Sequence, residues 1–371
     1  MCFYYKSKKK MKIVFILNSY GKSRYDKRIE EFIERGYDCE VYAFKRFEGD
    51  SIRSSFPVEV LGCFDNSLSY ARRTKIIYNA LISILKNKKG QNVIYYIFGL
   101  DVAMLFWLIR KKEPYIYEEG DLVHTYMKNN LIRKTLESID KKVIRSSELT
   151  VFTSEGFPEY HFGKRIENSV ILPNKISKRI LQIPPIEKKQ PFDINHLNIG
   201  FVGAPRFDKI LKFFEVACKN FPQHRFHIFG GPVPEEFEKL KSYSNLLFHG
   251  PFKTPDDLPE IYSHLDLVLS TYDTDSDNVR YAEPNKLYEA IFFETPIIVS
   301  RGTFLGEKVK KLNVGFEIDV TEQNVIRFLN ELSLDKINAI VNNIRRIPKE
   351  NAVDDGSELF IRIDDLLNSH S

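Results

Sequence analysis

Short, largely apolar strands alternate with helical segments along this chain, and that alternation constrains its fold more than any other feature. Lys12–Leu17, Val93–Phe98 and Asn198–Val202 are such strands, and helical patterns follow them. Nearly continuous apolar runs are typical of parallel sheets that are buried on both faces. Because strands separated by helices imply right-handed crossovers, we predict an α/β fold with mostly parallel sheets.

The strand and helix pattern divides into two halves around a proline-rich segment. Ile180–Phe192 carries three prolines among charged residues, which is typical of a linker. The pattern restarts at Asn198–Val202, and 371 residues are enough for two domains that each bury a core. We predict a first Rossmann-like domain over 1–180 and a second over 193–350. A last helix within 351–371 has no strand partner after it.

The two halves differ in charge. Residues 1–190 hold 35 Lys and Arg against 22 Asp and Glu, a balance of +13, whereas residues 191–371 hold 20 against 28, a balance of −8. A basic half of this kind favours an anionic partner, although two ordinary solvated surfaces are the simpler alternative. No zinc-finger spacing or RNP-like aromatic strand is present, so we expect no nucleic-acid partner. An anionic membrane surface is the preferred interpretation.

Cysteine spacing and hydropathy point to a cytoplasmic protein without a membrane anchor. The four cysteines show no CxxC or metal spacing, which suits a reducing compartment. The longest apolar stretch, Val93–Ile109, is interrupted by Gly99 and Asp101, which favours a strand, a turn and a core helix. Met1–Lys10 is basic but lacks the apolar region of a signal peptide, and translation from Met11 would also fit.

Glycines end three predicted strands of the second half. Gly203, Gly230 and Gly250 each follow an apolar run, and parallel strands end at one edge of a sheet. Backbone approaches a ligand most closely at glycine, and helix N-termini at this edge attract phosphate. One such glycine is ordinary turn chemistry, whereas three at one edge favour a ligand site.

Neither standard phosphate-binding motif accompanies these glycines. The absence of GxGxxG and GxxxxGK[ST] disfavours a dehydrogenase or a P-loop NTPase. Side chains must therefore hold any phosphate, and Arg206 and Lys286 are candidates because each opens a predicted helix. Lys286 and Glu289 are three residues apart and share a helix face. A lysine there can bind phosphate, and a glutamate can accept hydrogen bonds from a ribose diol; solvated surface charge is the alternative.

These segments resemble the GT-B glycosyltransferases, particularly family 4. The resemblance is carried in the second half by Gly200–Gly203 with Arg206 and Lys209, Ile228–Pro232, Asn245–Gly250, Leu258–Tyr262, Asp266–Leu269 and Pro284–Val299. In the first half it is weaker and rests on Asp26–Ile29, Gly36–Val41, Tyr117–Leu122 and Thr153–Phe157. It implies a GT-B fold, with two Rossmann-like domains whose parallel sheets face across a cleft, and a last helix that returns to the first domain.

The resemblance also implies a nucleotide-sugar site in the second domain. Arg206 and either Lys209 or Lys286 would bind the diphosphate, and Glu289 would take the ribose hydroxyls. The turn at Gly250 and Phe252 would meet the nucleobase. The remaining donor positions by resemblance are Gly203, Gly230 and Leu287. Basic side chains and helix dipoles replace a metal in such enzymes, so we expect no metal and no cofactor.

One departure from the family concerns the donor sugar. Family 4 commonly carries a second glutamate eight positions before the ribose-binding one, but that position is Tyr281 here. Glu283 is the nearest acid, six before Glu289, and lies off the same helical face. We assign Glu283 to the sugar as a catalytic candidate. Asp273-Thr274-Asp275 has the form of a metal motif but lies in a polar loop, and we expect no metal there.

The acceptor side rests on an acidic loop in the first half. Glu118, Glu119, Asp121 and His124 follow a predicted strand and are expected to face a cleft. In an inverting enzyme one of them would act as general base, whereas in a retaining one His124 would hold the donor sugar. Asp121 and His124 are therefore catalytic candidates, and an acidic loop that caps the next helix is the alternative.

Together these observations predict a hexosyltransferase that moves a sugar from a UDP- or GDP-sugar to a lipid-linked or polysaccharide acceptor. We expect a retaining, metal-independent enzyme of surface polysaccharide synthesis at the inner face of the cytoplasmic membrane. The basic face of Leu131–Ser146 would bind that membrane. A nucleotide-sugar epimerase, a sugar phosphorylase and a non-catalytic subunit of the same fold remain alternatives.

Overall fold

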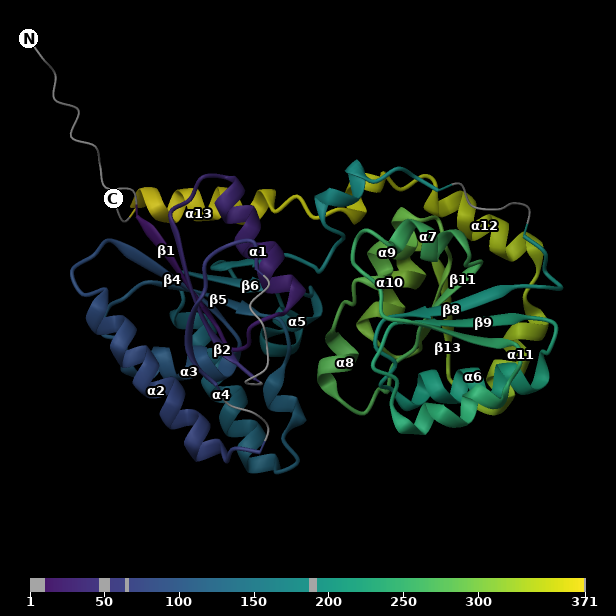
Figure 1. Cartoon of the computed structure of the whole chain (residues 1–371), viewed down its shortest axis with the longest axis horizontal. Coiled ribbons are helices and arrows are strands. Elements are labelled where there is room, and N and C mark those ends of the chain that lie inside the picture. The colour runs from purple at the N-terminus through teal and green to yellow at the C-terminus, as the bar shows by residue number, and fades with distance from the viewer. Residues whose placement is uncertain (1–10, 47–53, 64–66, 187–191, 370–371) are drawn as a thin grey trace, which may run out of the picture. The chain divides into compact units, whose positions relative to one another are not determined.

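The computed structural model describes residues 11–46, 54–63, 67–186 and 192–369 and divides into two compact units (Figure 1). Unit 1 runs to Leu172 and resumes at Gly356, and unit 2 is Pro173–Asp355. The basic segment 1–10 lies outside the described residues. No helix of the described part of the chain is both long and apolar enough to cross a membrane.

Unit 1 is built on a seven-stranded parallel sheet with the order β3-β2-β1-β4-β5-β6-β7. Its strands are β1 (Lys12–Leu17), β2 (Cys39–Lys45), β3 (Glu59–Cys63), β4 (Val93–Phe98), β5 (Tyr115–Glu119), β6 (Leu149–Phe152) and β7 (Ser169–Ile171). Its helices are α1 (Ser23–Glu34), α2 (Tyr70–Asn87), α3 (Leu100–Ile109), the short η1 (Val123–Tyr126), α4 (Asn130–Ser146), α5 (Gly156–Phe162) and α13 (Ser357–Ser369).

Unit 2 repeats this plan with a six-stranded parallel sheet of order β10-β9-β8-β11-β12-β13. Its strands are β8 (Asn198–Val202), β9 (Arg225–Phe229), β10 (Leu246–Gly250), β11 (Leu267–Ser270), β12 (Ile297–Ser300) and β13 (Gly315–Ile318). Its helices are η2 (Lys178–Gln182), α6 (Asp208–Asn220), η3 (Glu235–Ser242), α7 (Leu258–Ser263), α8 (Asp277–Tyr281), α9 (Lys286–Phe292), α10 (Phe304–Leu312), α11 (Glu322–Glu331), α12 (Leu334–Ile344) and η4 (Lys349–Ala352).

The predicted α/β class and the parallel sheets are confirmed. Alternate residues of a central strand pack on opposite faces of the sheet, as the continuous apolar runs required: Leu267 and Leu269 of β11 join one core cluster, and Val268 joins the other. Polar side chains fix where helices begin. Asn129, for example, accepts hydrogen bonds from the backbone N–H groups of Leu131 and Ile132 at the start of α4.

The chain passes between the units earlier than the predicted linker. Ile176 forms a parallel bridge with Val353, and Ile180 packs in a core of unit 2, so both belong to that unit although they were predicted to lie in the first domain. Phe192, the end of the predicted linker, is also buried in unit 2. Residues 187–191 of that linker lie outside the described residues.

The last helix, α13, completes the core of unit 1. Leu359, Phe360 and Ile363 join the cluster that contains Phe32 of α1. The rings of Phe32 and Phe360 lie 4.9 Å apart, and the Arg35 guanidinium lies 3.9 Å from the centre of the Phe360 ring. Figure 1 shows α13 beside α1. Unit 1 is therefore assembled from two parts of the chain, with the whole of unit 2 between them in sequence.

Candidate functional site

The strand order of unit 2 reverses between β8 and β11, so the carboxyl ends of these two strands flank the point where open α/β sheets bind ligands. Gly203, Gly230 and Gly250 lie at that edge. The Gly203 N–H donates to the Phe229 carbonyl at 2.7 Å, and the Gly230 N–H donates to the Gly250 carbonyl at 2.7 Å. The structure thus places the three glycines at one edge, as predicted.

Two of these glycines are required by close packing. Gly230 has a φ of +125°, and a Cβ there would lie 2.2 Å from the carbonyl oxygen of Gly203. Gly203 has a φ of +138°, and a Cβ there would lie 2.9 Å from the ammonium of Lys286. Gly230 therefore lets the backbones approach each other, whereas Gly203 leaves room for a lysine.

Lys286 begins α9 at this edge and is only 7% exposed. Its ammonium lies 5.0 Å from the centre of the Phe201 ring. Within the described part of the chain, this ammonium makes no hydrogen bond and no ion pair with a carboxylate. Its charge acts on the buried Glu289 without a direct ion pair between them. A nearly buried cation that no anion contacts is costly in a protein interior. The position of Lys286 therefore suits an anionic ligand.

Glu289 lies one turn along α9 and is only 3% exposed. Its two oxygens already accept hydrogen bonds, one from the Tyr262 hydroxyl at 2.7 Å and one from the Asn285 amide at 2.6 Å. Burial raises the pKa of Glu289, and the charge of Lys286 only partly offsets this effect. Each carboxylate oxygen has a second lone pair for a ribose hydroxyl. The bond to Tyr262 also ties α7 to α9, whereas the bond to Asn285 lies at the start of α9 itself.

The other predicted cations lie in more open surroundings. Arg206 is exposed, with its guanidinium 5.2 Å from the centre of the Phe207 ring. Lys209 is half-buried and donates to the Thr274 hydroxyl at 3.1 Å. The Asp273 carboxylate accepts hydrogen bonds from the backbone N–H groups of Asp208 and Lys209, both at 2.9 Å. Asp273 thus caps α6 and occupies N–H groups that the sequence offered to phosphate.

The remaining predicted donor residues differ in exposure. Leu287 is fully buried in the core of unit 2, so its side chain does not reach the sheet edge. Phe252 is half-buried and packs against the same cluster. A Cβ at Gly250 would meet no atom within 4 Å, so the turn that follows β10 is open. Of these three, Gly250 and Phe252 remain suitable for contact with a nucleobase.

Glu283, the predicted sugar-binding acid, is buried and paired. It is 4% exposed, and its Oε1 accepts hydrogen bonds from the Lys308 ammonium at 2.6 Å and from the Tyr288 hydroxyl. Its Oε2 has no hydrogen-bond partner among the described residues. Lys308, on α10, was missed because it lies 25 residues away in sequence and nothing in the local pattern links it to Glu283.

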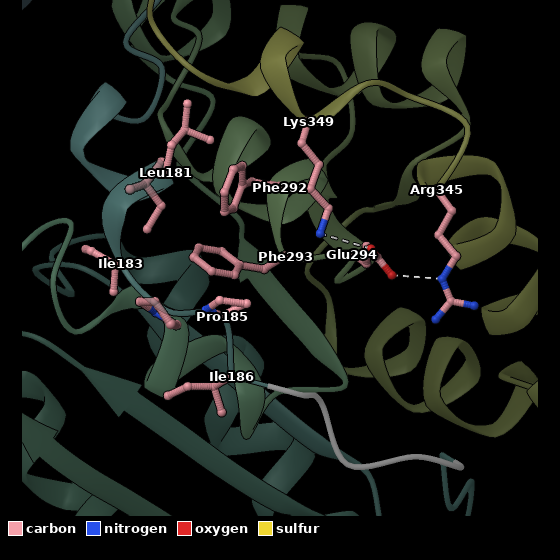
Figure 2. Close-up of a pocket in the computed structure, with 11 residues that line it drawn as sticks. Leu181, Ile183, Pro185, Ile186, Phe292, Phe293, Glu294, Arg345 and Lys349 are labelled. Carbon is pink, nitrogen blue, oxygen red and sulfur yellow. Dashed lines mark hydrogen bonds and ion pairs between the residues drawn. The ribbon is translucent and has the colours of Figure 1, made fainter.

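A separate hollow opens at the other end of α9 (Figure 2). It has a volume of about 550 Å³ and is lined largely by apolar side chains, including Phe292 and Phe293. Among the described residues of its wall, the one carboxylate, Glu294, is already bound by Arg345 at 2.8 Å and by Lys349 at 3.2 Å. Both described cations of the wall are therefore paired, and the hollow is distinct from the edge marked by Lys286.

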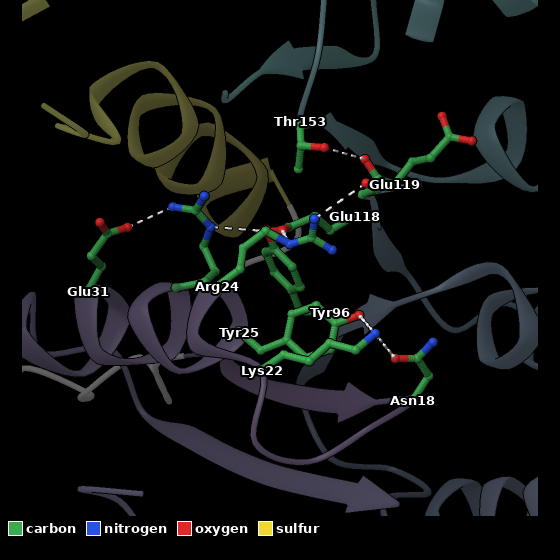
Figure 3. A network of polar contacts seen from close by, with 11 residues as sticks. Asn18, Lys22, Arg24, Tyr25, Glu31, Tyr96, Glu118, Glu119 and Thr153 are labelled. Atoms are coloured by element: carbon green, nitrogen blue, oxygen red, sulfur yellow. Dashed lines mark hydrogen bonds and ion pairs between the residues drawn. The ribbon is translucent and has the colours of Figure 1, made fainter. Parts of the chain in front are cut away.

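In unit 1, two arginines of α1 neutralise the buried Glu118 (Figure 3). Arg28 lies 3.4 Å from the Glu118 carboxylate and Arg24 lies 3.6 Å from it, and the Tyr96 hydroxyl donates to it at 2.6 Å. Arg28 also binds Glu31 at 2.7 Å. Glu118 is therefore a buried charge neutralised by two arginines near the end of β5, although its Oε1 accepts no hydrogen bond among the described residues.

Glu119, the next residue of β5, enters a different buried cluster. His161 Nε2 lies 2.9 Å from Glu119 Oε1, and His124 Nδ1 lies 3.3 Å from Asp140 Oδ2. Burial raises the pKa of Glu119 to about 8 and that of Asp140 to about 7, and Glu119 further raises the latter. Asp140 and His161 were missed by sequence reasoning because they lie on two later helices.

The predicted acidic cluster is thus divided by the structure. His124 is 0% exposed and lies against Asp140, so the expectation that it faces an open acceptor site is wrong for this conformation. Glu118 and Glu119 are equally buried, because β5 is a central strand of the sheet. Asp121, in the loop after β5, is the exposed member, and its role as general base stays a prediction.

Solved structures of known proteins share this fold over almost the whole chain. A sucrose-phosphate synthase from Thermosynechococcus elongatus superposes with a TM-score of 0.70 and 13% identity, covering 96% of this chain and 98% of the other. Anabaena HepE in complex with UDP gives 0.66 and 16%, covering 97% and 100%. The lipopolysaccharide outer core galactosyltransferase WaaB gives 0.61 and 18%, covering 91% and 95%.

The same architecture extends to another kind of enzyme. A putative UDP-N-acetylglucosamine 2-epimerase from Listeria monocytogenes superposes with a TM-score of 0.56 and 11% identity, covering 89% and 90% of the two chains. No protein-family model matches the chain, and no curated protein matches it by sequence. The chain therefore has the two-domain α/β fold of the GT-B glycosyltransferases.

Proposed function

We propose that this protein is a glycosyltransferase that uses a nucleotide diphosphate sugar, either a UDP- or a GDP-sugar. The observation that carries the proposal is the ammonium of Lys286, which is nearly buried and has no carboxylate partner among the described residues. It lies beside Gly203, where the strand order reverses and ligands bind in such sheets. HepE, which has the same fold, was solved in complex with UDP, and this supports a nucleotide as a ligand of the present chain.

The chemistry expected of this edge is charge stabilisation. When the bond between sugar and diphosphate breaks, negative charge grows on the leaving diphosphate, and a fixed cation in a water-poor site stabilises that charge. Lys286 supplies such a cation, and the exposed Arg206 can approach the same phosphates from solvent. We therefore propose transfer that needs no metal at the donor site and, from the resemblance to family 4, retains the anomeric configuration.

Nucleotide binding to wild type and to Lys286→Met tests the proposal. A ligand that binds the folded state at about 100 times its Kd stabilises it by about 2.7 kcal/mol, which a thermal melt detects. We expect UDP or GDP to raise the Tm of wild type and to lose this effect in Lys286→Met. Lys241→Ala, which removes an exposed lysine of the same unit, should respond as wild type does.

The melt without nucleotide shows whether the variant is folded. Methionine keeps the apolar stem of Lys286, so Lys286→Met should still fold, although the buried Glu289 loses the favourable charge of Lys286. If Lys286→Met folds and still gains the same Tm shift from nucleotide, the donor site lies elsewhere. If neither UDP, GDP nor their sugars shift wild type, the proposed function is wrong.

An epimerase is the second candidate, because the superposition on a putative epimerase shows that this fold serves that reaction as well. The products separate the two. A transferase releases UDP or GDP in step with a new glycosidic bond, and NMR of that bond reports retention or inversion. An epimerase instead gives a second nucleotide sugar in the absence of any acceptor.

For the acceptor, we propose a lipid-linked or surface-polysaccharide precursor at the inner face of the cytoplasmic membrane. The start of α4 supports contact with an anionic membrane surface, because Leu131 is 76% exposed beside the basic Arg133 and Lys134. Each basic side chain near an anionic leaflet gains about 1 kcal/mol, and an exposed leucine adds apolar insertion.

Co-sedimentation with vesicles tests this surface. Vesicles that contain phosphatidylserine should bind wild type, and the triple variant Leu131→Gln, Arg133→Gln, Lys134→Gln should bind much less. Lys111→Gln with Lys112→Gln removes two exposed charges of the same unit and is the matched control. Equal sedimentation of wild type with neutral and anionic vesicles would exclude the membrane contact.

A further inference from the structure

A cluster of two carboxylates and two imidazoles is buried in unit 1, in a different unit from the proposed donor edge. Glu119 ends β5, His124 lies in η1, Asp140 in α4 and His161 in α5. All four side chains are 0% exposed. Four separate elements of unit 1 therefore meet at this point.

The atoms of the cluster are spaced like the ligands of a metal ion. His161 Nε2 lies 2.9 Å from Glu119 Oε1 and 3.9 Å from Asp140 Oδ2, and His124 Nδ1 lies 3.3 Å from that same Oδ2. One ligand atom each from Glu119, Asp140 and His161 all lie within 4.8 Å of one another. Ligands at about 2 Å from a zinc ion are roughly 3 to 4 Å apart, which is close to this spacing.

The hydrogen bonding of the cluster is incomplete. Among the described residues, Glu119 Oε2, Asp140 Oδ2, His161 Nδ1 and both ring nitrogens of His124 have no hydrogen-bond partner. Fully buried polar atoms are nearly always satisfied by protein, water or an ion. These unpartnered atoms at a fully buried point leave capacity for a bound ion or for a shared proton.

The charge of the cluster favours a bound cation. Within the described residues, no lysine or arginine forms an ion pair with Glu119 or Asp140, whereas Glu118, one residue earlier, has two arginines. Buried carboxylates are normally paired with cations or bound to metals. A divalent ion bound by two carboxylates and a neutral imidazole gives a site without net charge.

We propose that Glu119, Asp140 and His161 bind a divalent transition-metal ion, with His124 positioned beside them against Asp140. Imidazole and carboxylate ligands suit zinc among the common metals. The ion would join β5, α4 and α5 and so stabilise unit 1. The proposal does not depend on the donor site of unit 2, where no metal is proposed.

Metal analysis of the full chain, purified without a histidine tag, is the primary test. We expect close to one equivalent of zinc per chain after loading with Zn²⁺ and desalting. Dialysis against a chelator should remove the zinc and lower the Tm, and added Zn²⁺ should restore both. Loading with Co²⁺ should give the visible absorption of a four-coordinate site with nitrogen ligands, which adventitious surface binding would not produce.

Two variants assign the ion to this cluster. His161→Gln and Asp140→Asn should each weaken zinc binding by about tenfold or more. His196→Gln is the control, because His196 is an exposed histidine that also contacts a carboxylate, Asp193 at 2.7 Å. It should bind zinc as wild type does.

The alternative is that a proton shared by Glu119 and Asp140 takes the place of a metal. In that case folded wild type would hold no zinc after loading, its Tm would not respond to chelator or Zn²⁺, and Co²⁺ would give no such spectrum. That combination would overturn the proposal even if the variants fail to fold, because it is measured on wild type alone.

Discussion

The two units each leave a buried charge without a direct ion-pair partner, and the signs are opposite. At the edge of unit 2, no carboxylate contacts the nearly buried Lys286 among the described residues, although Glu289 lies one turn along α9, whereas unit 1 buries Glu119 and Asp140 without an arginine or lysine partner among the described residues. Glu118 shows the balanced case, with two arginines around one carboxylate. The difference teaches that a buried cation without a bound anion can accept an anionic ligand, whereas buried carboxylates without a bound cation can accept a cation.

The largest expected loss of stability comes from removing an arginine that neutralises the buried Glu118. Arg28 is 1% exposed and neutralises Glu118, so Arg28→Ala leaves a buried carboxylate with one arginine fewer. Removing one partner of a buried ion pair typically costs about 3–5 kcal/mol. Urea unfolding measures this loss, and we expect unit 1 to be the part that unfolds first.

The double variant Arg28→Met with Glu118→Gln is the matched control for that loss. It removes both charges together and should regain most of the stability. A double variant as unstable as Arg28→Ala would show that packing of the arginine stem, and not charge balance, is what unit 1 requires.

A smaller loss of stability is expected at Gly203 of unit 2, which leaves room for the Lys286 ammonium. Gly203→Ala places a Cβ 2.9 Å from the Lys286 ammonium at a φ of +138°, and such backbone strain costs about 1–3 kcal/mol. The variant should also lose nucleotide-dependent stabilisation, because Lys286 must move. Gly302→Ala has a φ of +73° with no atom within 4 Å, so it should lose some stability but keep nucleotide binding.

The buried histidine His227 of unit 2 should make the stability of the protein depend on pH. A ring nitrogen of His227 lies 3.0 Å from His249 and the other lies 3.3 Å from the Asn198 side-chain oxygen, and burial, aided by His249, lowers the pKa of His227 from 6.5 to about 4. Between these values the unfolded chain binds a proton that the folded chain does not. Stability should therefore be complete above pH 6.5 and fall by roughly 1 kcal/mol per pH unit as pH drops toward 4.

Urea unfolding of wild type and of His227→Phe between pH 7 and pH 4.5 isolates this contribution, since the other titrating groups are common to both. The variant should show the shallower pH dependence. Parallel curves for the two proteins would mean that His227 is protonated in the folded state without cost.

The smallest effect on stability is expected at an exposed cation of the same edge. Arg206→Ala should change the free energy of unfolding by less than about 0.5 kcal/mol, because surface substitutions seldom do more. Its nucleotide affinity should fall less than that of Lys286→Met. Isothermal titration with UDP and GDP compares the two, and a larger loss in Arg206→Ala would shift the main phosphate contact from the buried lysine to the exposed arginine.

The sequence predicted the central strands and the glycine edge because their signals are local. An apolar run followed by glycine marks the ends of β8, β9 and β10 without knowledge of any distant residue. The edge strands β3 and β13 were missed, since neither contains a fully buried run: Glu59 and Val60 are exposed, and Gly315–Glu317 is half-buried. Exposed and half-buried residues interrupt the apolar run in these two strands, so neither gives a clear strand pattern.

Side-chain partners were the least predictable part of both sites. Glu119 meets His161 across 42 residues, and Glu283 meets Lys308 across 25, so no motif of fixed spacing contains either pair. Spacing did place Lys286 and Glu289 on one helix, but it did not show that Tyr262 and Asn285 already bind the glutamate. Composition and periodicity report which residues are present on an element and not which charges are matched within the core.

The discontinuous core of unit 1 has a consequence for how the protein is made. All residues of unit 2 leave the ribosome before Phe360 and Ile363 of α13 are synthesised, although unit 1 contains the first strand of the chain. Domains usually complete folding in the order of synthesis, N-terminal first. Here unit 2 can complete folding first, because unit 1 lacks part of its core until α13 is synthesised. Premature termination near residue 356 would therefore leave unit 1 incompletely folded and exposed to chaperones and proteases.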